Sequence, residues 1–233
     1  MKTVVITGTN RGLGLGFVTH YLEAGWKVIA INRHDSEALS ALKANVALTC
    51  LRAELTDEGD LARVAGELGS TDIDLLIHNA GVMGDANFRR EVMQKQSLAD
   101  FAREEWRKVF EINVFTPVQL TALLAPRLKD GATVVTLSSQ MGSIEQNSFG
   151  GWYAYRASKA AVNGIMKSMS LELADRGIIA IAMHPGWVRT DMGGPDADID
   201  TDTAIDGMTG VIAGLTLADS GRFLGYNGDE LPY

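Results

Sequence analysis

The first fourteen residues decide the fold, because the apolar run Val4-Val5-Ile6-Thr7 leads directly into Gly8-Thr9-Asn10-Arg11-Gly12-Leu13-Gly14. Glycine permits positive φ and lets the backbone come close to a pyrophosphate. The helix expected over residues 12–24 begins in the same turn, and its free N–H groups would face that anion. This strand–turn–helix order predicts a dinucleotide site. The alternative is a tight turn that serves only the packing of strand on helix.

Strand and helix patterns alternate along the rest of the chain. We expect strands at residues 4–7, 28–31, 46–51, 75–78, 133–138 and 179–184, and helices at residues 12–24, 36–44, 58–68, 101–128, 155–175 and 202–216. The alternation predicts βαβ units, and right-handed crossovers make these a doubly wound, Rossmann-like α/β sheet. No linker or repeat interrupts the pattern, so residues 1–233 are expected to form one domain.

Composition and charge narrow the choice of partners. Apolar residues make up 46% of the chain and charged residues 21%, as in ordinary globular proteins. The net charge of −8 repels phosphate backbones and anionic lipids, and no apolar stretch approaches the ~20 residues of a membrane span. Cys50 is the single cysteine, which suits a reducing compartment. We therefore expect a cytoplasmic protein with a small-molecule partner, and neither nucleic acid nor membrane.

Two arginines stand near the expected position of an adenosine ribose. Asn32-Arg33 ends the second strand, where an acidic residue favours NAD and an arginine accommodates the 2′-phosphate of NADP. Arg11 lies in the glycine turn, so two guanidinium groups could bond that phosphate. The expected cofactor is NADP(H), with NADPH preferred and NAD(H) as the weaker alternative. Solvated surface charge is the other interpretation of each arginine.

Tyr155 and Lys159 lie at the start of the helix expected over residues 155–175, where positions four apart share a face. A tyrosine titrates near a pH of about 10, and a neighbouring ammonium group lowers its pKa. Upstream, the strand expected over residues 133–138 leads into Ser138 and Ser139, whose hydroxyls could bond a substrate carbonyl. The chemistry alone does not choose between these serines, and either could simply cap the strand.

These motifs occur in a recognisable order. TGxxxGxG spans residues 7–14, and it is followed by Asn79-Ala80-Gly81, Ser139, Tyr155-xxx-Lys159 and His184-Pro185-Gly186. Together they resemble the short-chain dehydrogenase/reductase family across essentially the whole chain. SSQMGSI, GGWYAYRASKAAVN and HPGWVRTDMGGP are similar to the carbonyl-reductase branch that includes the C-factor and Sniffer proteins.

The resemblance implies catalytic roles. Ser139 would polarise the substrate carbonyl, with Ser138 in support, and Tyr155 would transfer the proton. Lys159 would bind the nicotinamide ribose and lower the pKa of the tyrosine. Asn113 matches the asparagine that holds a water in the family's proton relay.

The residues expected to bind the cofactor come from the turns that follow the strands. They are Gly8, Asn10, Arg11, Gly12, Leu13, Gly14, Asn32, Arg33, Glu54, Leu55, Asn79, Ala80, Gly81, Tyr155, Lys159, Pro185, Gly186, Val188 and Thr190. Glu54 departs from the family, which usually has Asp there. His78 replaces a frequent Asn and is expected to be a packing residue, not a general base.

Two irregular segments and Trp152 each have two possible roles, and an acidic run is not expected to bind a metal. Residues 83–100 and 190–207 are expected to form excursions from the sheet that act as lids or are mobile loops. Trp152 either lines the substrate cleft or packs its own loop. The acidic run at residues 196–202 lacks the glycine and the final acid of a calcium loop, so no metal is expected.

The sequence thus predicts an NADP(H)-dependent reductase of a ketone or aldehyde, reversible toward alcohol oxidation. The alternative is a nucleotide-bound signalling or regulatory protein of C-factor type with secondary catalysis. Family members pair through the helices expected at residues 101–128 and 155–175, so a homodimer or homotetramer is expected. Extra apolar residues on these helices support pairing, namely Trp106, Phe110, Val118, Leu120, Val162, Ile165 and Met169.

Overall fold

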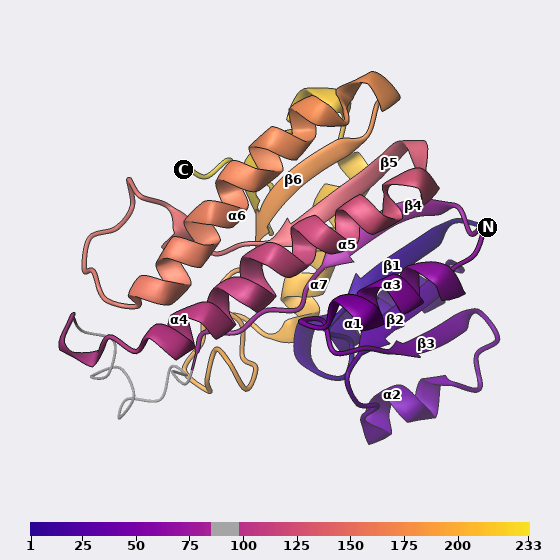
Figure 1. Ribbon diagram of the computed structural model, residues 1–233, viewed down its shortest axis with the longest axis horizontal. Coiled ribbons are helices and arrows are strands. Elements are labelled where there is room, and N and C mark those ends of the chain that lie inside the picture. The colour runs from indigo at the N-terminus through magenta and orange to yellow at the C-terminus, as the bar shows by residue number, and fades with distance from the viewer. Residues whose placement is uncertain (85–97) are drawn as a thin grey trace.

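One parallel sheet carries all seven strands found in residues 1–84 and 98–233, which the computed structural model describes. The strand order is β3-β2-β1-β4-β5-β6-β7 (Figure 1). Their bounds are β1 Thr3–Thr7, β2 Lys27–Asn32, β3 Leu48–Arg52, β4 Ile73–His78, β5 Leu128–Leu137, β6 Ile179–His184 and β7 Phe223–Gly225. Because β2 and β4 flank β1, the chain reverses its direction of winding there, and a crevice forms at the carboxyl ends of the strands.

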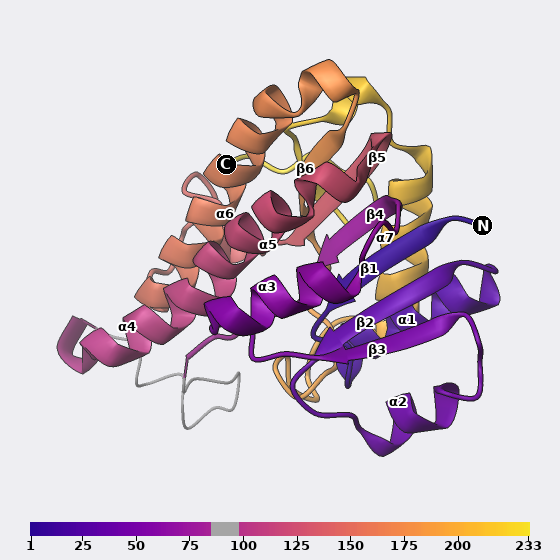
Figure 2. The same ribbon diagram turned by 45° about the vertical axis from the view of Figure 1, so that its right-hand side comes forward.

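Helices cover both faces of the sheet, as Figure 2 shows. The α-helices are α1 Gly12–Glu23, α2 Glu37–Leu42, α3 Glu58–Glu67, α4 Arg103–Phe110, α5 Thr116–Leu124, α6 Tyr153–Glu172 and α7 Thr201–Gly214. Single helical turns are the π turn η3 Glu111–Phe115 and the 3₁₀ turns η2 Leu98–Asp100, η4 Ala125–Arg127, η5 Gln140–Gly142, η6 Ala174–Arg176 and η7 Leu217–Asp219. The doubly wound Rossmann-like prediction is confirmed, and the fold is a single domain.

Alternate strand residues build two cores, since successive side chains point to opposite faces. Val5 and Ile29 pack with Leu61 of α3, Leu120 of α5 and Met166 of α6. The other core lies beneath α1 and α7, and contains Val4, Ile6, Phe17, Ile205 and Met208. The sheet is therefore buried on both sides, which explains why its strands have continuous apolar runs.

The helix predicted over residues 101–128 corresponds to the continuous helical stretch Arg103–Arg127, which contains a π turn that was not predicted. It comprises α4, the π turn η3 and α5, and Leu128 already belongs to β5. The π turn coincides with Asn113, whose buried side chain bonds to groups outside its own helix. Such turns are frequent at functional sites. Strand β7 was not predicted, because three residues carry too little alternation to show a strand.

By length and composition, the helical stretch Arg103–Arg127 could cross a membrane, which the sequence analysis did not anticipate. It has 25 residues and a mean hydropathy of 1.3 over its most apolar window. Leu120 and Leu124 of this stretch are fully buried in the core beneath α3 and α6. The apolar character of this stretch is therefore explained by its packing as a helix against the sheet.

Candidate active site

A cavity of about 630 Å³ lies at the carboxyl ends of the central strands. It is bordered by the β1–α1 turn, the ends of β2 and β4, the start of α6 and the segment after β6. Most of the expected cofactor residues line it: Gly8, Asn10, Arg11, Gly12, Leu13, Gly14, Asn32, Arg33, Glu54, Leu55, Asn79, Ala80, Gly81, Tyr155, Lys159, Pro185 and Thr190.

The glycine turn is closed tightly enough to exclude side chains. Gly8 has a φ of 72°, and a Cβ on Gly14 would lie 2.0 Å from the Gly8 carbonyl oxygen. The Asn79 amide donates to the carbonyl oxygens of Thr7 and Gly8, at 2.9 Å each. Asn79 therefore ties the end of β4 to the turn, and the turn leaves the N-terminus of α1 open toward the cavity. This cradle fits the pyrophosphate of a dinucleotide.

Both arginines of the expected phosphate site are paired with carboxylates. Arg33 lies 3.6 Å from Glu54, and Arg11 pairs with Asp191. All four side chains are well exposed, so these pairs contribute little to stability and can exchange for another anion. Glu54 thus faces the arginine that the sequence analysis assigned to the 2′-phosphate.

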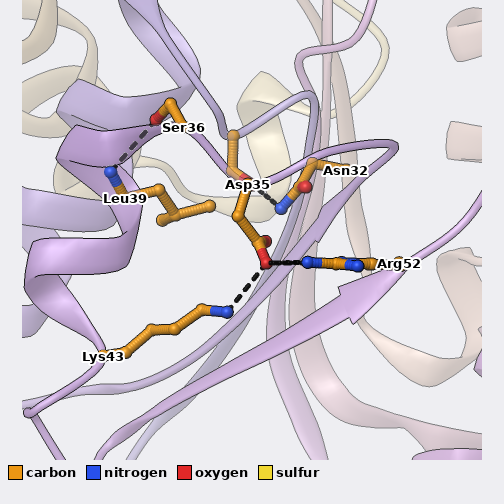
Figure 3. A network of polar contacts seen from close by, with 7 residues as sticks. Asn32, Asp35, Ser36, Leu39, Lys43 and Arg52 are labelled. Carbon is orange, nitrogen blue, oxygen red and sulfur yellow. Dashed lines mark hydrogen bonds and ion pairs between the residues drawn. The ribbon is translucent and has the colours of Figure 1, made fainter.

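Asn32 and Asp35 fix the loop that presents Arg33 (Figure 3). The Asn32 amide donates to Thr9 Oγ1 at 3.2 Å, which joins the end of β2 to the glycine turn. Asp35 Oδ2 accepts from Lys43 Nζ at 2.8 Å and from Arg52 Nη2 at 2.9 Å. These two hydrogen bonds hold the pKa of the Asp35 carboxyl below its usual value.

The start of α6 places Tyr155 and Lys159 together. Lys159 Nζ lies 5.7 Å from the centre of the Tyr155 ring and donates to the Leu137 carbonyl oxygen at 2.7 Å. Tyr155 is hydrogen-bonded to Ser139. Both Tyr155 and Lys159 are buried. The phenol and the ammonium group therefore both line one end of the cavity, and the Ser139 hydroxyl lies next to the phenol.

Burial controls the protonation of this pair. It raises the pKa of Tyr155 to about 12, and the hydrogen bond with Ser139 offsets only part of that rise. It lowers the pKa of Lys159 to about 8. Burial and Ser139 are the causes of the tyrosine shift, so the lowering of the tyrosine pKa by Lys159 stays a prediction. With this raised pKa, Tyr155 is protonated at neutral pH.

The structure distinguishes the two serines that chemistry left open. Ser138 Oγ donates to Asn163 Oδ1 of α6 at 2.6 Å. Ser139 bonds to Tyr155 and accepts from the Met141 backbone N–H at 3.1 Å. Ser139 is therefore the hydroxyl placed beside the phenol.

A family model described as short chain dehydrogenase matches residues 2–199. The chain belongs to the short-chain dehydrogenase/reductase family. It is 42% identical over 163 residues to the C-signal of Myxococcus xanthus, which covers 69% of this chain and 93% of that protein. As a member of this family, the protein is an oxidoreductase.

Two solved structures extend the likeness to the whole fold. An NADPH-bound carbonyl reductase from chicken fatty liver is 31% identical, with a TM-score of 0.89, over 100% of this chain and 99% of that one. The carbonyl reductase Sniffer of D. melanogaster is 28% identical, with a TM-score of 0.90, over 100% of both chains. The predicted resemblance to carbonyl reductases of the family is confirmed.

Four expected site residues of this short-chain dehydrogenase do not line the cavity. Ser139 is buried next to the lining residues Ser138 and Tyr155, and Val188 is buried and paired with Ile199. A Cβ on Gly186 would lie 2.7 Å from Ile199, so Gly186 shapes its segment. Asn113 accepts from the Val82 N–H at 2.8 Å and donates to Ser158 Oγ at 3.0 Å, so it braces the site from beneath.

Sequence reasoning missed several residues that line the cavity. They are His34, Val82, Ile112, Leu137, Arg189, Asp191, Met192 and Thr201, besides Ser138, which it gave only a supporting place. Most of these residues lie next to an expected site residue in the sequence, and that position was the only signal that could have found them. Of the expected lids, residues 85–97 lie outside the described residues, and Asp200 of the acidic run caps α7 through Thr203.

His78 illustrates a departure from the family pattern that has a structural explanation. It is buried, its Nε2 lies 2.7 Å from Thr121 Oγ1, and burial lowers its pKa to about 3. A neutral, buried imidazole that joins β4 to α5 is a packing residue, as the sequence analysis expected.

Proposed function

We propose that this protein is an NADPH-dependent reductase that converts a ketone or aldehyde to an alcohol, reversibly. The single observation that carries the proposal is the contact of Tyr155 with Ser139 beside Lys159, at one end of a cavity whose other end holds Arg33. The NADPH-bound carbonyl reductase among the similar structures supports both the cofactor and the substrate class.

Each residue of the site has a distinct task in this reaction. The glycine turn would hold the pyrophosphate, and Lys159 the nicotinamide ribose. The bound cofactor supplies a hydride to the carbonyl carbon. Ser139 orients the carbonyl oxygen, and the Tyr155 phenol donates its proton to that oxygen. With a pKa of about 12, the phenol carries at neutral pH the proton that this step requires.

The preference for NADPH rests on Arg33 and Arg11. Both line the cavity on exposed side chains, and a 2′-phosphate would replace Glu54 or Asp191 as their partner. Glu54 opposes the phosphate electrostatically, so the preference should be moderate.

A panel of ketones and aldehydes tests the proposal directly. Loss of NADPH absorbance with at least one of them, dependent on enzyme concentration, is the expected result. No turnover across aliphatic, aromatic and cyclic carbonyls, in an enzyme that binds NADPH, would overturn it.

The likeness to the C-signal favours a second candidate, a nucleotide-bound signalling or regulatory protein with secondary catalysis. The intact set of Ser139, Tyr155 and Lys159 argues for catalysis, because a binding module needs no such phenol. We also propose a cytoplasmic location, which cell fractionation would test.

A further inference from the structure

Trp152 occupies an unfavourable backbone conformation directly before the catalytic helix α6. Its φ of 46° and ψ of 41° are left-handed, and no other non-glycine residue in the described parts of the chain has positive φ. Gly150 and Gly151 precede it with φ of 66° and 69°. Glycine or asparagine adopts this conformation readily, whereas a bulky residue does so only where its surroundings enforce it.

The side chain of Trp152 explains why this conformation persists. It is only 6% exposed and forms a small buried cluster with Met83 and Tyr155, against which Met141 packs. This cluster is separate from the two cores of the sheet. The exposed ring of Phe149 lies edge-on to Trp152, with ring centres 6.0 Å apart. The contacts of the indole ring therefore stabilise the strained turn.

The cluster bears directly on the orientation of the Tyr155 ring. Trp152 and Tyr155 are three residues apart at the first turn of α6, where such positions are neighbours. The hydroxyl end of the Tyr155 side chain bonds to Ser139, and its ring packs among the cluster residues. The ring can turn away from Ser139 only if the cluster opens.

We propose that Trp152 is a positioning residue, whose ring holds Tyr155 with its hydroxyl toward Ser139 and excludes water from the phenol. The sequence analysis left Trp152 between lining the cleft and packing its loop. The kinetic consequence of this inference rests on the proposed carbonyl reduction, whereas its structural consequence does not.

Two substitutions separate the ring from the backbone. Trp152→Asn keeps a residue that tolerates the left-handed conformation and removes the ring. Trp152→Phe retains an aromatic ring at the same backbone. Ile144→Asn is the matched control, because Ile144 is in the same loop and 78% exposed.

Turnover is the first readout. Trp152→Asn should lower kcat about tenfold to a hundredfold, as a misplaced reacting group does, with the KM for NADPH almost unchanged. Trp152→Phe should recover most of kcat, and Ile144→Asn should match the wild type. An Asn variant with wild-type kcat, or a Phe variant as slow as the Asn variant, would overturn the inference.

The second readout needs no substrate. Fluorine NMR of protein labelled with fluorotyrosine gives signals from five tyrosines, and Tyr155→Phe assigns the one of interest. In Trp152→Asn this signal should shift and become sensitive to heavy water, while in Trp152→Phe it should stay as in the wild type. An unchanged signal in the Asn variant would refute the inference even if carbonyls are reduced. A changed signal in an enzyme that reduces no carbonyl would refute only the proposed function.

Discussion

At the residue scale, burial is the main cause of the pKa shifts of Tyr155 and Lys159. Tyr155 is a poor acid by its pKa of about 12, and Lys159 is half-way to losing its charge at a pH of about 8. Lys159 uses its ammonium group on the Leu137 carbonyl oxygen, a neutral partner that does not restore the usual pKa. Of these two groups, Lys159 is therefore the one expected to titrate closer to neutral pH in the free enzyme.

The pH dependence of kcat/KM for NADPH follows from this difference. It should fall as the pH rises through about 8, because Lys159 then loses the charge that we propose binds the ribose hydroxyls. Tyr155 stays protonated through that range, since its pKa is about 12. A profile measured at constant ionic strength checks this. A flat profile between about pH 7 and about pH 10 would contradict it.

The cofactor preference also belongs to single residues. Arg33→Ala should raise the KM for NADPH about tenfold and leave that for NADH nearly unchanged, because one exposed charge-assisted bond contributes about 1.5 kcal/mol. Glu54→Gln should lower the KM for NADPH, since it removes the carboxylate that now pairs with Arg33. Steady-state kinetics with both cofactors measure these effects. Equal weakening of NADH and NADPH by Arg33→Ala would show that Arg33 is no phosphate ligand.

At the element scale, the site is made by turns that follow strands, and each turn is held by a specific tie. Asn79 holds the glycine turn, Asn113 holds the segment after β4, and Asp35 holds the loop between β2 and α2. These contacts are hydrogen bonds. The bond of Asn113 joins residues 31 apart in sequence, the bond of Asn79 joins residues 72 apart, and those of Asp35 are more local. Removing one of these hydrogen bonds should therefore loosen the turn that it holds and leave the rest of the fold in place.

Asp35→Asn tests one such tie. Unfolding free energy should fall by about 1–2 kcal/mol, because Lys43 and Arg52 lose their shared carboxylate but remain partly solvated. The folded-state pKa of Asp35 is lowered, so its contribution is present above a pH of about 4 and is lost on acidification. Urea unfolding at two pH values measures this. A difference between wild type and variant that does not shrink at low pH would exclude the charge-based explanation.

The elements differ in how well the sequence predicted them. Buried strands such as β1, β2 and β6 could be placed within about a residue, because both faces of each are apolar. The π turn at Asn113 could not, since it depends on bonds to Val82 and Ser158 from elsewhere in the chain. The pairing of Arg33 with Glu54 was equally hidden, because it needs the register of β2 on β3.

The site was predicted better in its identities than in its geometry. The resemblance named Tyr155, Lys159 and Ser139, but it gave no sign of the burial that raises the tyrosine pKa. It also left Trp152 undecided, because a left-handed residue cannot be seen from the letters alone.

At the scale of the whole molecule, the helical stretch Arg103–Arg127 and helix α6 carry exposed apolar residues. Phe115 at the end of η3 is 53% exposed and Leu171 of α6 is 69% exposed. By contrast, Leu120 and Val162, which supported pairing in the sequence analysis, belong to the local core. Fewer apolar residues than expected are therefore exposed for association on these helices.

We propose that these helices pair two copies of the chain. Light scattering at micromolar concentration should give the mass of a homodimer or a homotetramer, and Phe115→Asp should reduce it to that of a monomer, because a buried charge is costly at an apolar interface. Leu217→Asp is a control at an exposed leucine in η7, which belongs to neither α5 nor α6. A wild-type monomer would refute pairing.

The central claim, that Tyr155 is the proton donor of a carbonyl reductase, has one direct measurement. NADPH oxidation with the best carbonyl substrate is compared for the wild type, Tyr155→Phe and Tyr153→Phe, a half-exposed neighbour on the same helix. Tyr155→Phe should lose about a hundredfold to ten-thousandfold in kcat while NADPH fluorescence still reports binding, and Tyr153→Phe should behave as the wild type. Turnover by Tyr155→Phe at a rate near that of the wild type would contradict the account.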